Sequence, residues 1–183
     1  MIYCEPKPDA ALLTEIAGSK EVFLLGCSLC ANISYCIHNQ LQSPIFSFEN
    51  VDQNLGIAAL LEGAINLKDE IKRLKQVLAE QGIHTGSAAL PSLCCIRREH
   101  QQAVIQATAE YETVVTLSCE NGSQNVEDFL GVKRVVGAMK NRGLMRATMD
   151  QSGMAFRFDK DRLYINNRKY SAHGTADQAD QQL

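Results

Sequence analysis

The chain has 183 residues, of which 45% are hydrophobic, and it carries a formal net charge of −3. This length suits one compact domain with a small appendage, and the weak acidity argues against general nucleic-acid binding. The sequence has neither an apolar run of membrane-spanning length nor a signal-peptide pattern, which predicts a cytoplasmic protein. Seven cysteines are many for such a protein. In a reducing compartment, clustered thiols bind metal or do redox chemistry more often than they form disulfides.

The first 30 residues predict an extended arm, a short helix and a buried strand. The arm covers residues 1–8, and the helix covers residues 10–17 with Asp9 as its cap. The strand, Glu21–Leu25, is apolar without alternation, as is typical of a strand covered on both faces. It leads directly into the sequence GCSLC over residues 26–30.

Strands and helices alternate through the middle of the chain. The clearest helix is expected over 60–81, where apolar residues recur every three or four positions. Such alternation predicts an α/β fold: a layered, mostly parallel sheet flanked by helices. Further helices are predicted over 31–41 (capped by Asn32 or Ser34), 97–111 and 125–130, and further strands over 45–48, 83–93, 114–117 and 132–138.

The last third of the chain changes character. Residues 154–158 and 162–165 alternate apolar and polar side chains around Asp159-Lys160-Asp161, which predicts a β-hairpin. The polar sequence that follows predicts disorder. We therefore expect a cysteine-rich α/β metal-binding domain over 1–150, a C-terminal β-hairpin appendage over 151–170 and a disordered tail over 171–183.

Cysteines follow three of the predicted strands. Cys27 and Cys30 follow the first, Cys94 and Cys95 the second, and Cys119 the third. Ligands of open parallel sheets bind beyond the carboxyl ends of the strands, so we expect these thiols to meet there. Thiolates are soft donors that favour an iron–sulfur cluster or tetrahedral zinc over calcium or magnesium. Adjacent cysteines on an extended backbone point apart, so one of Cys94 and Cys95 is the expected ligand, and we favour Cys95.

Two cysteines lie outside this pattern. Cys36 falls in the predicted helix after Cys30 and is a weaker candidate ligand, whereas Cys4 lies in the arm. Burial in the apolar core is an equally good interpretation of both. The histidines show no metal-binding spacing, and no GxGxxG or P-loop motif occurs, so no self-contained nucleotide site is predicted.

Three stretches carry a resemblance to a known family: Val22–Ala31, which ends in GCSLCA, and the pairing of Cys95–Glu99 with Leu117–Val126. They resemble the methylenetetrahydrofolate reductase C-terminal family. This family is the cysteine-rich small subunit, or fused tail, that accompanies the flavin-containing reductase in acetogenic and related bacteria. The resemblance covers about residues 20–135. The chain departs from the family pattern at Glu120, where a glycine is expected, and over 37–60, which resembles an insertion.

The resemblance implies an α/β domain that holds a [4Fe–4S] cluster on Cys27, Cys30, Cys95 and Cys119. It further implies a non-catalytic electron-transfer subunit that works beside a flavoprotein reductase in one-carbon metabolism. Two other functions stay open. Zinc in the same thiolate cage would make the chain a structural or interaction module without a redox role. A metal-free domain would instead use the CxxC pair for thiol exchange.

Overall fold

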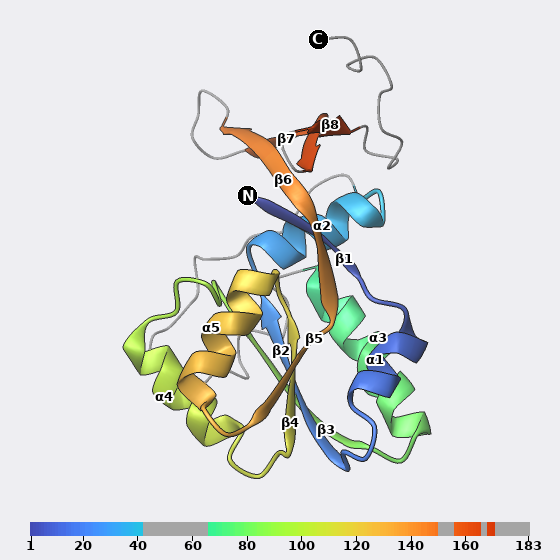
Figure 1. Cartoon of the computed structure of the whole chain (residues 1–183), viewed down its shortest axis with the longest axis vertical. Helices are drawn as coiled ribbons and strands as arrows, with labels where there is room; N and C mark the ends of the chain where they lie inside the picture. Colours follow the sequence, from blue (N-terminus) through green and yellow to red (C-terminus); the bar gives the residue numbers. More distant parts are fainter. Residues whose placement is uncertain (42–65, 150–155, 166–167, 171–183) are drawn as a thin grey trace.

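The computed structural model describes residues 1–41, 66–149, 156–165 and 168–170. The predicted strand over 45–48, the start of the predicted 60–81 helix and the predicted disordered tail lie outside the described residues. Within those residues the chain forms two four-stranded sheets, with strand orders β3-β2-β4-β5 and β1-β6-β7-β8 (Figure 1). None of the helices in the described part is both long enough and apolar enough to span a membrane.

The first sheet is parallel throughout. Its strands confirm four of the predicted ones and are β2 (Glu21–Cys27), β3 (His84–Leu90), β4 (Thr113–Leu117) and β5 (Arg134–Gly137). The uncharged run that predicted β2 is fully buried from Val22 onward. Because β3 lies on one side of β2 and β4 on the other, the strand order reverses between β2 and β4. Open α/β sheets bind their ligands at such a switch point.

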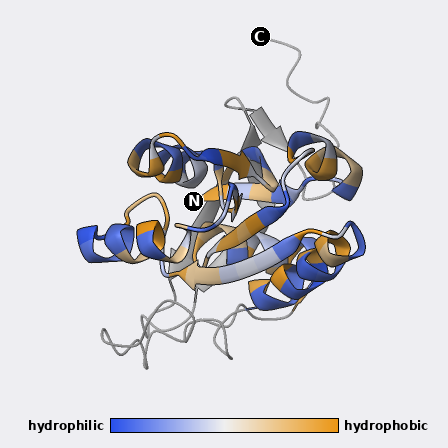
Figure 2. Cartoon of the chain, turned by 90° about the horizontal axis from the view of Figure 1, so that it is seen from below, coloured by the Kyte–Doolittle hydropathy of each residue, from blue (hydrophilic) through white to orange (hydrophobic). Residues whose placement is uncertain are grey.

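Helices cover both faces of this sheet, which confirms the predicted layered α/β fold. They are α1 (Asp9–Glu15), α2 (Cys30–His38), α3 (Leu67–Glu80), α4 (Arg98–Ala107) and α5 (Glu120–Leu130). The helices α1 and α3 lie on one face, and α4 and α5 lie on the other (Figure 1). Figure 2 shows hydrophobic and hydrophilic residues alternating along the helices, as expected of helices with one face on a sheet.

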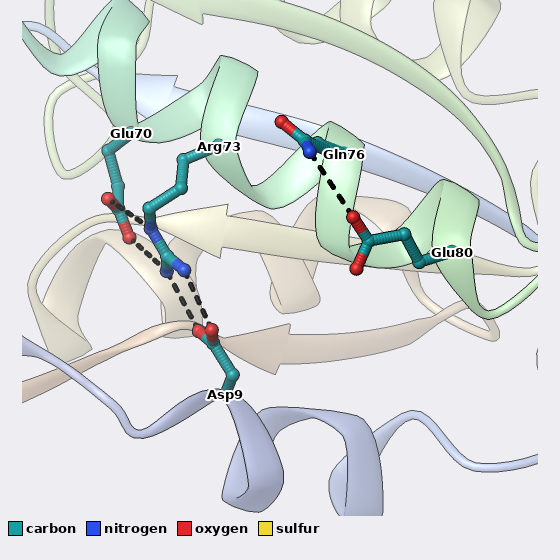
Figure 3. Close-up of polar contacts among 5 residues, drawn as sticks. All are labelled: Asp9, Glu70, Arg73, Gln76 and Glu80. Atoms are coloured by element: carbon teal, nitrogen blue, oxygen red, sulfur yellow. Dashed lines mark hydrogen bonds and ion pairs between the residues drawn. The ribbon is translucent and has the colours of Figure 1, made fainter.

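An ion-pair cluster joins α1 to α3 (Figure 3). The Arg73 guanidinium lies 2.7 and 2.8 Å from the two carboxylate oxygens of Asp9, and its Nε lies 2.9 Å from Oε2 of Glu70. Hydrogen bonding to Arg73 lowers the pKa of the Asp9 carboxyl. The predicted capping role of Asp9 is wrong, because α1 begins at Asp9 and the residue before it makes no side-chain cap. Glu70 is only 7% exposed although it is charged, and its ion pair with Arg73 neutralises it.

The predicted caps of α2 also have other roles. Asn32 and Ser34 lie inside this helix and are fully buried, while its first residue is Cys30. The side-chain oxygen of Asn32 accepts the backbone N–H of Leu67 at 3.0 Å, which anchors the start of α3. The Ser34 hydroxyl accepts the backbone N–H of Cys4 at 3.1 Å. Both side chains therefore tie α2 to neighbouring elements.

The second sheet is antiparallel and includes the N-terminal arm. Its strands are β1 (Ile2–Pro6), β6 (Met139–Met149), β7 (Phe156–Ile165) and β8 (Arg168–Tyr170). The predicted turn at 159–161 is wrong, because β7 runs through this triplet and pairs with β6 instead. The triplet has no glycine or proline to force a turn, and β6 offers a long partner strand. The sheet thus combines the predicted appendage with strands from both ends of the predicted 1–150 domain.

Strand β1 brings this second sheet over the carboxyl ends of the parallel strands. The N-terminal ammonium of Met1 donates to the carbonyl of Met145 on β6 at 2.9 Å. Tyr3, Ile33 and Met145 form a small buried cluster that packs β1 and β6 against α2. The helix α2 therefore packs against β1 and β6, next to the predicted cysteine site.

Candidate functional site

Two buried cysteines lie side by side at the switch point of the parallel sheet. Cys27 is the last residue of β2, and Cys119 caps the start of α5 just after β4. The parallel register pairs Gly26 with Leu117, so the two chain segments leave the sheet together. Both cysteines are 2% exposed. The expected convergence of these two strand-end cysteines is therefore present.

Cys30 adds a third sulfur at the first residue of α2, where it is partly exposed. Its thiol faces that of Cys119, and the hydrogen bond from Cys119 lowers the pKa of Cys30 to about 6. The same contact with Cys30, together with burial, raises the pKa of Cys119. This contact thus favours the charged form of Cys30 and the neutral form of Cys119. The N–H of Ile2, the charge of the N-terminal ammonium and the start of α2 also favour negative charge on Cys30.

Backbone N–H groups point at these sulfurs. The Cys27 sulfur accepts hydrogen bonds from the N–H groups of Leu29, Leu93 and Ala31. Burial nevertheless raises the pKa of the Cys27 thiol, so these bonds only partly offset its loss of water. The N–H of Gly122 donates to the Cys119 carbonyl at 2.9 Å and lies near enough to the Cys119 sulfur to favour its charged form. Hydrogen bonds of this kind stabilise thiolates and tune the metal centres that thiolates hold.

The loop after β3 places Cys94 and Cys95 at the solvent side of this site. Both are exposed, whereas Leu93 between them and the strand is fully buried and fixes the loop. The Ser92 hydroxyl lies 3.4 Å from the Cys94 sulfur and accepts the N–H of Cys95 at 3.3 Å. Contact with Cys94 raises the pKa of Cys95, and the charge of Cys30 acts in the same direction. The thiols expected at the third strand end, those of Cys94 and Cys95, therefore border the site but are exposed to solvent.

The remaining two cysteines are buried. Cys36 lies within α2, where burial raises the pKa of its thiol to about 11. Cys4 lies on β1 with its sulfur 3.8 Å from that of Met139, and burial raises its pKa to about 12. The charges of Cys30 and Cys27 also act on Cys4, so this thiol lies near the site. Sequence spacing could not reveal that proximity, because it depends on β1 pairing with β6.

The donor chemistry suits a soft metal centre. All the converging side chains are thiols, which favour iron–sulfur clusters or zinc over calcium and magnesium. Among the described residues, however, no group of three or more Cys, His, Asp or Glu side chains is placed to hold a metal ion. Cys27, Cys30 and Cys119 suit a thiolate centre in donor type and strand placement, and their side chains would have to move closer together to bind one. A fourth thiolate would come from the exposed pair Cys94 and Cys95.

Comparison with known proteins identifies no relative of this chain. No family model matches the chain, and neither a curated protein nor a solved structure matches it.

Proposed function

We propose that this chain is a cytoplasmic accessory subunit that transfers electrons through one [4Fe–4S] cluster. Cys27, Cys30, Cys119 and Cys95 would hold the cluster, with Cys94 as the neighbouring thiol. The observation that carries the proposal is the meeting of Cys27, Cys30 and Cys119 at the switch point, with backbone N–H groups directed at their sulfurs. A bound cluster supplies reversible one-electron transfer.

The residues around the site have distinct roles in this proposal. Burial of Cys27 and Cys119 excludes water from the inner side of the centre. The N–H donors from Leu29 and Leu93 reduce the negative charge on the Cys27 sulfur, which raises the reduction potential of a thiolate-bound centre. The exposed loop at Cys94 and Cys95 leaves one edge open to the surface, as electron exchange with a partner protein requires.

The proposed partner is a flavin-dependent reductase of the methylenetetrahydrofolate reductase type, which places the chain in one-carbon metabolism. The support for the partner is the resemblance of three stretches, 22–31, 95–99 and 117–126. These stretches include all of the proposed ligands. The test is to mix the dithionite-reduced subunit with such a flavoprotein and follow flavin reduction by stopped-flow absorbance. Transfer that disappears in Cys119→Ser supports the partner, and no transfer from the cluster-loaded subunit contradicts it.

Elemental analysis of anaerobically purified protein tests the centre itself. We expect a brown protein with a broad visible absorbance and about four iron and four sulfide per chain. About one zinc per chain without iron or sulfide would instead support a structural module built on the same thiolates. A colourless protein without iron, even after anaerobic reconstitution, would overturn the iron–sulfur proposal. A Cys27–Cys30 disulfide in that protein after mild oxidation would then favour thiol exchange.

A further inference from the structure

A pocket of about 370 Å³ opens between α5 and the chain segment that joins β5 to β6. Two of the residues that line it are Gly137, the last residue of β5, and Glu120, next to Cys119. The pocket therefore lies at the carboxyl end of the parallel sheet, the region where α/β sheets bind their ligands. None of the proposed cluster ligands lines it.

Polar groups on the pocket wall are held in place by neighbouring side chains. The Ser123 hydroxyl lies 2.7 Å from that of Thr116 and 3.0 Å from that of Ser118. The Asn141 amide nitrogen donates to the Glu120 carboxylate at 3.0 Å, and its oxygen accepts the Glu120 backbone N–H at 3.0 Å. The Ser123 hydroxyl and the Glu120 carboxylate are therefore oriented without a ligand, which lowers the entropy cost of binding one.

The pocket presents opposite charges on its two sides. On α5 stand the carboxylates of Glu120 and Glu127, and on β6 stands the ammonium of Lys140. Among the residues that the structure describes, Lys140 forms no ion pair, whereas the nearby Lys7 is paired with Glu15 at 2.7 Å. A ligand with one carboxylate and one ammonium would match both sides.

The space for such a ligand depends on Gly137, which has no side chain. A Cβ atom built on Gly137 would lie 3.3 Å from the Ser123 hydroxyl oxygen and 3.8 Å from the Met139 carbonyl oxygen. The backbone there does not have a positive φ, so a larger residue is conformationally acceptable. Substitution at Gly137 therefore takes up pocket space and displaces the Ser123 hydroxyl by a few tenths of an ångström.

We propose that this pocket binds a small zwitterion of the amino-acid class. Its carboxylate would bind Lys140 and Ser123, and its ammonium would bind Glu120 and Glu127. The site uses none of the thiols, so the inference does not rest on the iron–sulfur proposal.

Calorimetry on the full chain tests this site with a panel of the common L-amino acids. We expect at least one to bind, and its deaminated and decarboxylated analogues to bind about tenfold more weakly or worse, because each loses a charge-assisted hydrogen bond. Gly137→Val and Lys140→Gln should each weaken binding by a similar factor. Arg142→Gln is the matched control on the same strand, since Arg142 pairs with Glu5 and does not line the pocket.

Three results would overturn the proposal. The first is that no member of the panel binds. The second is that both analogues bind as tightly as the amino acid, which would show that the opposite charges of the pocket do not contribute to binding. The third is that Gly137→Val and Lys140→Gln bind like Arg142→Gln, which would place the ligand elsewhere. Circular dichroism spectra and melting curves of the variants identify any loss of binding that arises from misfolding.

Discussion

The two ends of the parallel sheet carry different kinds of side chain. At the amino end, the Ser19 and Thr113 hydroxyls lie 2.7 Å apart, and the Glu112 carboxylate accepts the N–H of Lys20 at 2.8 Å. Tyr111 closes this end with its ring edge-on to Phe23 at 5.1 Å. At the carboxyl end, by contrast, five of the seven cysteines gather, two of them exposed.

This difference separates structural residues from candidate functional ones. The polar groups named at the amino end are paired with one another, which stabilises the fold. The Cys30 thiol at the carboxyl end contacts another thiol, and backbone N–H groups and the N-terminal ammonium favour negative charge on it. Substitutions at the carboxyl end should therefore change metal content, whereas substitutions in the sheet interior and on the helix faces should change stability.

The largest effect is expected from Cys119→Ser. A hydroxyl is a poor ligand for a soft metal, so this variant should lose nearly all of the iron that the proposal assigns to the wild-type protein. Iron and sulfide per chain after anaerobic reconstitution measure the effect. Cys36→Ser is the matched control, because Cys36 is also 2% exposed but lies within α2, away from the strand ends.

The iron contents of these two variants can support or contradict the role of the strand-end position. Equal iron contents in Cys119→Ser and Cys36→Ser would show that the strand-end position has no special role. Far-ultraviolet circular dichroism of both variants separates loss of a ligand from loss of the fold.

A large effect on stability alone is expected from Leu24→Ala. Leu24 lies in the middle of β2 and is fully buried, so its truncation should cost about 2–5 kcal/mol in the free energy of unfolding. Urea denaturation of the metal-free protein measures this cost. Iron per folded chain should stay at the wild-type value, and a selective loss of iron without destabilisation would contradict the separation of the two regions.

A smaller effect is expected from Asp9→Asn, which breaks the ion pair between α1 and α3. The pair is partly exposed, so the loss at neutral pH should be about 0.2–1 kcal/mol. Arg73 lowers the pKa of Asp9 in the folded state, so its contribution is complete above the unfolded pKa of about 3.9 and fades as the pH falls through the folded value. Urea denaturation across acidic pH should show the wild type and the variant converging.

Glu80→Gln is the control for this pH dependence. Glu80 accepts a hydrogen bond from Gln76 at 3.2 Å on the same helix and forms no ion pair in the described structure (Figure 3). Its stability difference from the wild type should stay small and flat over the same pH range. A difference between wild type and Asp9→Asn that persists at low pH would show that Asp9 acts through packing.

Local sequence patterns could predict the parallel sheet because its strands are short, apolar and separated by helices. The run Glu21–Leu25 and its following cysteines fixed the position of β2 and of two site thiols. Long-range pairings could not be predicted. The partner of β1 lies more than 130 residues away on β6, and the burial of Glu70 depends on Arg73 and Asp9 meeting across two helices.

The pairing of thiols shows the same limit. The CxxC spacing draws attention to Cys27 and Cys30 as a pair. In the structure, Cys30 instead faces Cys119, because the strand order sets β4 beside β2. Spacing along the chain therefore identified the thiols, while the sheet order determined which of them meet.

The most direct test of the thiolate centre is the alkylation rate of each cysteine, measured by mass spectrometry with and without iron–sulfur reconstitution. In the metal-free protein, Cys30 should react rapidly because it is a partly exposed thiolate, and Cys94 and Cys95 should react because they are exposed. Reconstitution should protect Cys30 and one of the adjacent pair, while the other stays reactive. Unchanged alkylation rates at all three cysteines would contradict the assignment of these thiols to a metal centre.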